Sequence, residues 1–163
     1  MDNEYLIIKE SKVHNKGAFA RKFIPKGTRV IQYIGRIISK EESDQILHES
    51  YQNHLKDSNH AIPYLFELDN KHDLDGNITE NVAKFINHSC NPNLEVEIKG
   101  HEVFLDAIRD INQGEELNYN YGFDLDDDTF KNHCYCNSHN CMNYICNEND
   151  WDKLKEKLNN KIS

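Results

Sequence analysis

The apolar residues of this chain fall in short runs separated by turn-forming residues, and this pattern limits the folds it can adopt. One run, Thr28–Ile34, directly follows the turn signal Pro25-Lys26-Gly27. No run approaches the roughly 20 residues that a membrane-spanning helix needs, so we expect no integral membrane protein. Short runs between turn signals are typical of β-strands. The sequence therefore predicts a mainly β protein with a few helices.

Turn residues separate five segments that have the apolar or alternating pattern of strands. We expect a tight turn at Lys16-Gly17, a hairpin turn at Lys99-Gly100, and polar turn residues throughout Asp69–Asn77. The expected strands are Tyr5–Ile8, Thr28–Ile34, Tyr64–Leu68, Leu94–Ile98 and Val103–Ala107.

Two segments have helical patterns. Ser39, with Glu42 three residues later, matches a capping box, and helically spaced apolar residues follow until the turn formers that begin at Asp57. The last residues form one apolar stripe and predict a terminal helix. The two sets of helically spaced residues are Leu47, Tyr51 and Leu55, and Trp151, Leu154, Leu158 and Ile162.

Length and charge limit the functional class. A chain of 163 residues fits one domain, and we find no internal repeat or long linker. Its net charge of −9 argues against direct nucleic-acid binding and suits a basic protein partner. The acidic start, Met1–Glu4, lacks the layout of a signal peptide, so we expect an intracellular protein.

The cysteines near the C-terminus have the spacing of metal ligands. Cys134 and Cys136 would lie on one side of an extended strand, and Cys141 follows a turn-forming stretch. Three thiolates can take three corners of a tetrahedral zinc site. The alternative is a set of unrelated thiols, and a Cys134–Cys136 disulfide would be strained. The candidates for a fourth ligand are Cys90, Cys146, His133 and His139.

The segment Asn87-His88-Ser89-Cys90-Asn91-Pro92-Asn93 has the composition of a loop. It could be a turn with a buried His and Cys, or it could carry a Cys/His nucleophilic pair. Neither interpretation accounts for the rest of the chain.

Five motifs, taken in order, resemble the SET-domain protein-lysine methyltransferases, and their trithorax-like members most of all. The similarity spans about residues 5 to 147. In it Asn15 stands where the family usually has glycine, and Asn tolerates left-handed backbone geometry. The motifs are Ser11–Ala20, Tyr33-Ile34-Gly35, Phe85–Cys90, Gly114–Tyr121, and Cys134-Tyr135-Cys136 followed by Cys141.

The resemblance implies a SET fold of small, curved β-sheets with a pseudo-knot, in which the Asn87 loop and the Tyr121 segment interlock. It implies a SET domain at 5–123, a post-SET zinc-binding segment at 130–147 and a C-terminal helix at 148–163. The implied zinc ligands are Cys90, Cys134, Cys136 and Cys141, which leaves Cys146 spare. The implied contacts to S-adenosylmethionine are His14, Lys16, Gly17, Tyr64, Asn87, His88 and Tyr135.

Tyr33, Tyr119 and Tyr121 are the candidate catalytic residues. Methyl transfer needs a neutral amine held in line with the donor, and tyrosines line a dry channel without charge while their hydroxyls direct the amine. Any one of these tyrosines could instead be an ordinary core residue. Tyr119 matches the family's phenylalanine/tyrosine switch position, which implies mainly monomethyllysine as product.

We therefore expect a stand-alone methyltransferase that acts on a lysine of a basic protein. The substrate could be a histone tail, which would place the enzyme in the nucleus at chromatin, or a basic non-histone protein in the cytoplasm. The alternatives are a catalytically weak SET-like module that binds peptide or cofactor, and a zinc-stabilised interaction protein unrelated to methylation.

Overall fold

The computed structural model describes residues 3–13, 15–56, 63–126, 129 and 132–162. They form two compact units. The first comprises Ile31–Lys84 and Glu97–Leu105, and the second comprises Asp2–Val30, Phe85–Val96 and Asp106–Ser163. Among the described residues, no helix is both long and apolar enough to cross a membrane.

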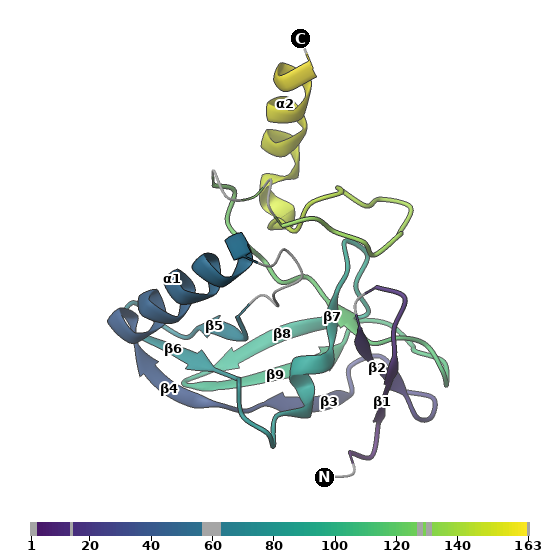
Figure 1. Cartoon of the computed structure of the whole chain (residues 1–163). Coiled ribbons are helices and arrows are strands. Elements are labelled where there is room, and N and C mark those ends of the chain that lie inside the picture. Colours follow the sequence, from purple (N-terminus) through teal and green to yellow (C-terminus); the bar gives the residue numbers. More distant parts are fainter. Residues whose placement is uncertain (1–2, 14, 57–62, 127–128, 130–131, 163) are drawn as a thin grey trace. The chain divides into compact units, whose positions relative to one another are not determined.

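Short strands build small sheets throughout the described chain (Figure 1), so the expectation of a mainly β protein with few helices is confirmed. The sheet orders are β1-β2, β7-β10, β3-β9-β8 and β4-β6-β5. The strands are β1 (Leu6–Glu10), β2 (Lys16–Ala20), β3 (Arg29–Tyr33), β4 (Arg36–Ser39), β5 (Leu65–Glu67), β6 (His72–Asp75), β7 (Asn87–His88), β8 (Leu94–Lys99), β9 (Glu102–Ala107) and β10 (Asn118–Tyr119). The helices are α1 (Lys40–Lys56) and α2 (Trp151–Ile162), with single turns η1 (Val82–Phe85) and η3 (Glu148–Asp150).

In the first unit, α1 lies beside β4 and β6 (Figure 1). The Ser39 hydroxyl accepts the Glu42 backbone N–H at 3.2 Å, so the expected N-terminal cap is present. The helix is described as far as Lys56, and the end expected before Asp57 falls at residues outside the described ones. Leu47 and Tyr51 share its helical spacing but are exposed, so this stripe contributes little to the core.

The prediction of turn residues throughout Asp69–Asn77 was wrong, because β6 lies within it and pairs with β4 and β5. Its sequence is polar, but its carboxylates have cationic partners. Asp73 accepts from Lys40 at 2.7 Å and Asp75 accepts from Arg36 at 2.9 Å. A charged strand can therefore occupy the centre of a sheet, which alternation of apolar residues does not reveal.

The second unit begins with the antiparallel pair β1–β2, in which Leu6 faces Ala20. The turn expected at Lys16-Gly17 is wrong, since both residues lie in β2. A Cβ atom on Gly17 would lie 2.4 Å from Glu116 Oε1, so this glycine permits a close approach and does not form a turn. Asn15, just before it, has a φ of 32°, which agrees with its expected left-handed tolerance.

The Asn87 loop and the Tyr121 segment meet through a parallel pair of two-residue strands. Asn87 faces Asn118 and His88 faces Tyr119 across β7 and β10. The Ser89 N–H also donates to the Tyr119 carbonyl at 3.1 Å. The two segments that the SET resemblance expects to interlock therefore lie side by side.

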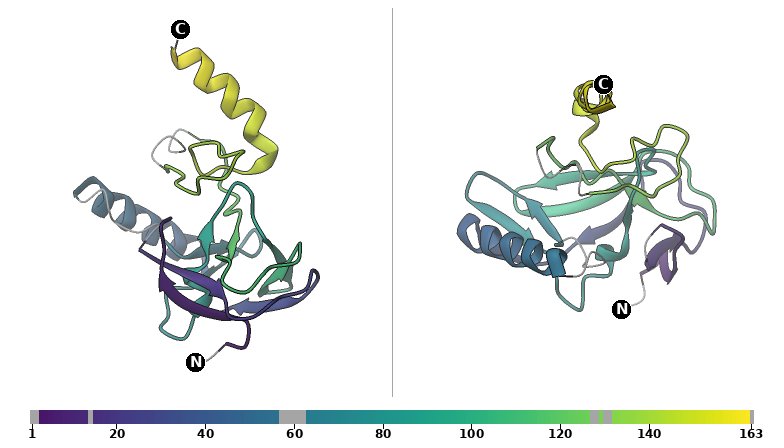
Figure 2. Two further views of the ribbon diagram at one scale, coloured as in Figure 1. Left: turned by 90° about the vertical axis from the view of Figure 1, so that its right-hand side faces the viewer. Right: turned by 45° about the horizontal axis from the view of Figure 1, so that its top comes forward.

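The C-terminal part of the second unit is a loop followed by α2, which extends away from that loop (Figure 2). The single turn η3 precedes α2. The Asn147 side chain accepts the Asn149 N–H and caps the N-terminal end of this turn. Leu154 is fully buried, whereas Lys153 and Lys155 pair with acids on the surface of the helix. The expected terminal helix is present.

Candidate active site and metal centre

Asn87 is the residue that connects the motifs of the second unit. Its side-chain nitrogen donates to the Lys16 carbonyl at 3.0 Å and to Glu116 Oε1 at 2.9 Å. The same Glu116 oxygen accepts from the Ser11 hydroxyl at 2.6 Å. None of the residues that the structure describes donates to Asn87 Oδ1. Because its nitrogen is held by the protein, this amide presents its oxygen as an acceptor for a ligand.

The neighbours of His88 determine which of its ring nitrogens carries the proton. Its Nδ1 accepts the Tyr121 backbone N–H at 3.2 Å, so a neutral His88 carries its proton on Nε2. That nitrogen lies 3.6 Å from Cys90 Sγ, to which it can donate. His88 thus links the backbone of Tyr121 to the sulfur of Cys90.

Tyr119 and Tyr121 form an aromatic cluster with His88. The two tyrosine rings lie 4.9 Å apart, and the Tyr121 ring meets His88 edge-on at 5.3 Å. The Tyr121 hydroxyl donates to the Ile86 carbonyl at 3.3 Å. Tyr119 is 7% exposed. The two tyrosines therefore lie side by side, although Tyr121 lies just beyond β10.

Two other tyrosines among the predicted site residues, Tyr33 and Tyr64, lie together in the first unit. Tyr33 is buried, and its hydroxyl donates to the Tyr64 carbonyl at 3.5 Å. Its ring packs edge-on against Phe66 at 4.6 Å. A Cβ atom on Gly76 would lie 2.2 Å from the Tyr33 ring, so this ring needs a glycine beside it.

Four cysteines of the second unit form a cluster in which all sulfur atoms lie within 4.8 Å of one another. Cys90 Sγ and Cys134 Sγ are 3.8 Å apart, which matches the separation of about 3.8 Å between sulfurs in a tetrahedral zinc site. The sulfurs of Cys136 and Cys141 accept backbone N–H groups at 3.5 and 3.4 Å, which stabilises thiolates. All five cysteines are free, and the fifth, Cys146, is buried outside the cluster.

The cluster shares protons among its sulfurs. A hydrogen bond from the Cys134 thiol lowers the pKa of Cys90 to about 4, and the same bond raises the pKa of Cys134. Burial raises the pKa of Cys141. A divalent cation would replace these shared protons and permit four thiolates. The residues present therefore fit a structural zinc ion.

A family model described as "SET domain" matches residues 15–122. This chain belongs to the SET-domain family. Similar proteins include "Histone-lysine N-methyltransferase 2D" of Homo sapiens, at 35% identity over 148 residues, or 88% of this chain. "Histone-lysine N-methyltransferase trithorax" of Drosophila melanogaster is 36% identical over 87% of the chain. "Histone-lysine N-methyltransferase, H3 lysine-4 specific" of Schizosaccharomyces pombe is 37% identical over 83%. The matched regions cover only 2%, 4% and 14% of these relatives, respectively.

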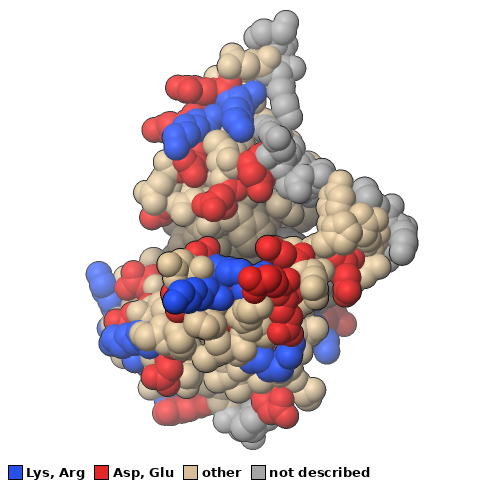
Figure 3. All heavy atoms as spheres, turned by 90° about the vertical axis from the view of Figure 1, so that its left-hand side faces the viewer, with Lys and Arg blue, Asp and Glu red and all other residues tan. Residues whose placement is uncertain are grey.

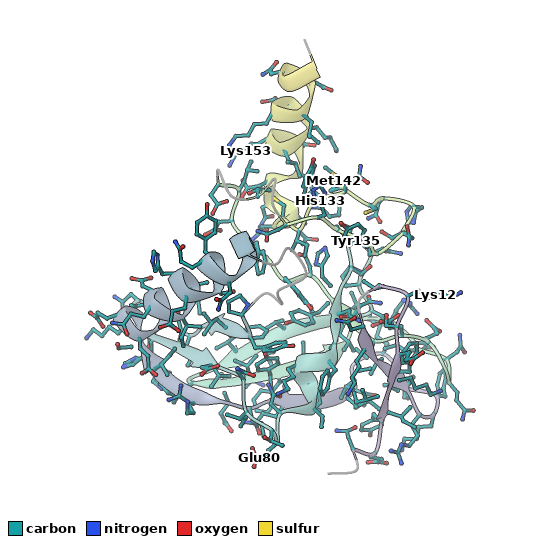
Figure 4. The ribbon with its side chains drawn as sticks, viewed as in Figure 1. Lys12, Glu80, His133, Tyr135, Met142 and Lys153 are labelled. Carbon is teal, nitrogen blue, oxygen red and sulfur yellow. The ribbon has the colours of Figure 1, made fainter. Side chains whose placement is uncertain are left out.

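Within this SET domain, the second unit brings Lys16, Gly17, Asn87 and His88 together with Tyr119 and Tyr121. Tyr135 is 61% exposed on the cysteine-bearing segment, where Figure 4 shows it near His133 and Met142. It borders an open hollow of about 520 Å³ with His133 and His139. His14 lies outside the described residues.

Sequence reasoning missed the role of Glu116 in this SET domain. Glu116 was part of a recognised motif, but its partners are Ser11 and Asn87, which are distant in sequence. The only available signal was Gly17, whose missing side chain makes room for the Glu116 carboxylate.

Proposed function

We propose that this chain is a protein-lysine N-methyltransferase that transfers a methyl group from S-adenosylmethionine to a lysine side chain of a basic protein. The observation that carries the proposal is the β7–β10 pair, which places Tyr119 and Tyr121 beside His88 and next to Asn87. An aromatic, uncharged cluster of this kind suits a neutral amine, the form of lysine that can attack a methyl group.

Tyr121 is proposed to position the lysine amine. Its hydroxyl proton is directed to the Ile86 carbonyl, so the phenolic oxygen can accept an N–H from the amine. The hydrogen bond from the Tyr121 backbone N–H to His88 fixes the backbone from which this side chain extends. Orientation is the main contribution that a protein makes to such a transfer.

Asn87 is proposed to bind the methyl donor. When bound, S-adenosylmethionine supplies the methyl group and a sulfonium charge, and its ammonium and amine groups are hydrogen-bond donors. Asn87 Oδ1 can accept from such a donor because the amide nitrogen is already committed to Lys16 and Glu116. The other residues proposed to contact the donor are Lys16, Gly17 and His88, together with His14, Tyr64 and Tyr135. Tyr33 remains a proposed channel residue.

The cysteine cluster is proposed to hold one zinc ion that supports the site. Cys90 lies two residues after β7, and Cys134 and Cys136 flank Tyr135, so the metal would join these two parts of the second unit. The proposed division is a SET domain at 5–123, a post-SET segment at 130–147 and the C-terminal helix at 148–163.

The proposed substrate is a Lys-rich segment such as a histone tail, as the names of the relatives suggest. The net charge of −9 favours a basic partner. Acidic side chains are spread over the face in Figure 3, interspersed with lysines and arginines. A histone substrate would place the protein in the nucleus at chromatin.

Tyr121→Phe tests the proposal. We expect turnover on histone peptides to fall by about one to three orders of magnitude while S-adenosylmethionine binding, measured by calorimetry, is retained. Tyr5→Phe, which removes a hydroxyl elsewhere in the second unit, should leave turnover unchanged. Wild-type turnover in Tyr121→Phe would move the positioning role to another residue. Donor binding without transfer in the wild type would favour the weak binding module.

Tyr119→Phe tests the number of methyl groups added. A hydroxyl at this position can hold the amine or a water molecule, which leaves little room for an added methyl to rotate away. A change of about 1.4 kcal/mol in the barrier to the second methyl transfer changes the rate of that transfer tenfold. We expect monomethyllysine from the wild type and a shift to dimethyl and trimethyl product in Tyr119→Phe. Time-resolved mass spectrometry measures these products. Early trimethyllysine from the wild type would contradict the assignment.

A further inference from the structure

Two histidines and an aspartate that belong to none of the motifs named above converge on the surface of the first unit. Asp69 lies in the turn between β5 and β6, His72 begins β6, and His101 lies in the turn between β8 and β9. Their metal-binding atoms all lie within 4.8 Å of one another. Residues from two separate turns therefore present three donors to one point.

The carboxylate of Asp69 is the fixed centre of this cluster. Its Oδ1 accepts the backbone N–H groups of Lys71 at 2.7 Å and His72 at 2.8 Å. These bonds, with those from the two imidazoles, lower the pKa of Asp69, so the group is anionic at neutral pH. These hydrogen bonds fix the orientation of the Asp69 side chain, so its carboxylate is already in position for a ligand.

Each imidazole directs a ring nitrogen at that carboxylate. His101 Nε2 lies 2.9 Å from Asp69 Oδ2, and His72 Nδ1 lies 3.1 Å from Asp69 Oδ1. The two rings are inclined at 57° with centroids 5.3 Å apart, so they approach the carboxylate from different directions. This is a convergent arrangement of two nitrogen donors and one oxygen donor.

The three metal-binding side chains determine which ions this cluster can bind. Imidazole and carboxylate together favour zinc and other late first-row divalent ions over calcium or magnesium. Neighbouring ligand atoms in a tetrahedral zinc site lie about 3.3 Å apart, close to the observed contacts. The three side chains are 36% to 44% exposed, which leaves room for water at the remaining positions.

We propose that Asp69, His72 and His101 form a second metal site, which binds one late first-row divalent cation at the surface of the first unit. It differs from the cysteine cluster in its nitrogen and oxygen ligands and in its open coordination. The ion joins the β5–β6 turn to the β8–β9 turn.

Calorimetric titration of NiCl2 into the zinc-loaded, full-length protein tests the proposal. We expect one nickel ion per chain in the wild type, and at least about tenfold weaker binding in His72→Ala and His101→Ala. Asp69→Asn keeps an acceptor for the two backbone N–H groups but removes the charge, so it should fold and bind nickel more weakly. His48→Ala, which removes an imidazole from α1, should bind nickel like the wild type.

His101→Gln and nuclear magnetic resonance separate metal binding from a structural role. Glutamine can still donate to Asp69, so His101→Gln should match the wild type in thermal stability without metal and yet lose nickel binding. Nickel should broaden the amide signals of residues 69–72 and 100–102 in the wild type. Equal nickel affinity in the wild type, His72→Ala and His101→Ala would show only a carboxylate bridging two histidines and would overturn the proposal. Broadening centred on the cysteine segment would do the same.

Discussion

The carboxylates buried in the first unit and the amides buried at the motifs of the second unit are stabilised in different ways. The first unit neutralises carboxylates on its central strand with the cations Arg36 and Lys40. The second unit uses uncharged amides, among which Asn87 and Asn93 are buried and bond to distant backbone groups. Ion pairs tolerate variation in geometry, whereas a buried amide has fixed donor and acceptor directions. The proposed catalytic tyrosines Tyr119 and Tyr121 are in the amide-held unit, where position matters most.

Removal of zinc should produce the largest difference between the units. Structural zinc contributes on the order of 10 kcal/mol to small domains that depend on it. We expect a chelator to disorder the cysteine-bearing segment and weaken donor binding, while amides of the first unit keep their protection from hydrogen exchange. Equal loss of protection in both units would mean that the metal supports the whole chain.

Cysteine variants identify the ligands. Native mass spectrometry should find about one zinc fewer per chain in Cys90→Ser than in the wild type, and an unchanged zinc content in Cys146→Ser. Cys146 is as buried as Cys90 and lies outside the cluster, so it is a matched control. Loss of zinc in Cys146→Ser with retention in Cys90→Ser would reverse the ligand assignment.

Asn93→Ala should have the next largest effect. The Asn93 side chain donates to the Glu116 carbonyl at 2.8 Å and accepts the Asn118 N–H at 2.9 Å. Alanine leaves the part-buried Asn118 N–H without this partner, and the Glu116 carbonyl keeps only the Asn118 side chain as donor, at a cost of about 2 kcal/mol in the free energy of unfolding. Urea denaturation measures this cost, with the exposed Asn91→Ala as control. Near-equal stability of the two variants would show that the amides do not hold this unit.

Lys40→Met should have the smallest effect. The ion pair with Asp73 is partly exposed, so we expect a loss of about 1 kcal/mol or less, which shrinks as salt increases. The hydrogen bond to Asp73 raises the pKa of Lys40. This contribution is therefore complete below about pH 10.5 and is lost as pH rises through the folded-state pKa. Lys26→Met is the exposed control, and a loss as large as that of Asn93→Ala would remove the contrast between the units.

The sequence predicted the SET fold because its motifs occur in a fixed order, and it predicted five of the ten strands of the described residues because their apolar runs are bounded by turns. It did not predict β6, because Asp73 and Asp75 look like loop residues until Lys40 and Arg36 pair with them. The cysteine cluster could be predicted from spacing, but only the resemblance selected Cys90 as the fourth ligand. Three-dimensional convergence, as at Glu116 and at the Asp69 cluster, leaves no local pattern in the sequence.

The bond from Ser11 to Glu116 also has a consequence for how the protein forms. It joins residues 105 positions apart, and Asn87 bonds to Lys16 across 71 positions. Contacts of such long range incur their loop-closure entropy before they return any stabilisation, so chains that depend on them fold on a timescale of roughly milliseconds to seconds. During synthesis, the bond from Ser11 to Glu116 cannot form until residue 116 has left the ribosome. We therefore expect the proposed donor-binding region to be among the last parts of the molecule to become ordered.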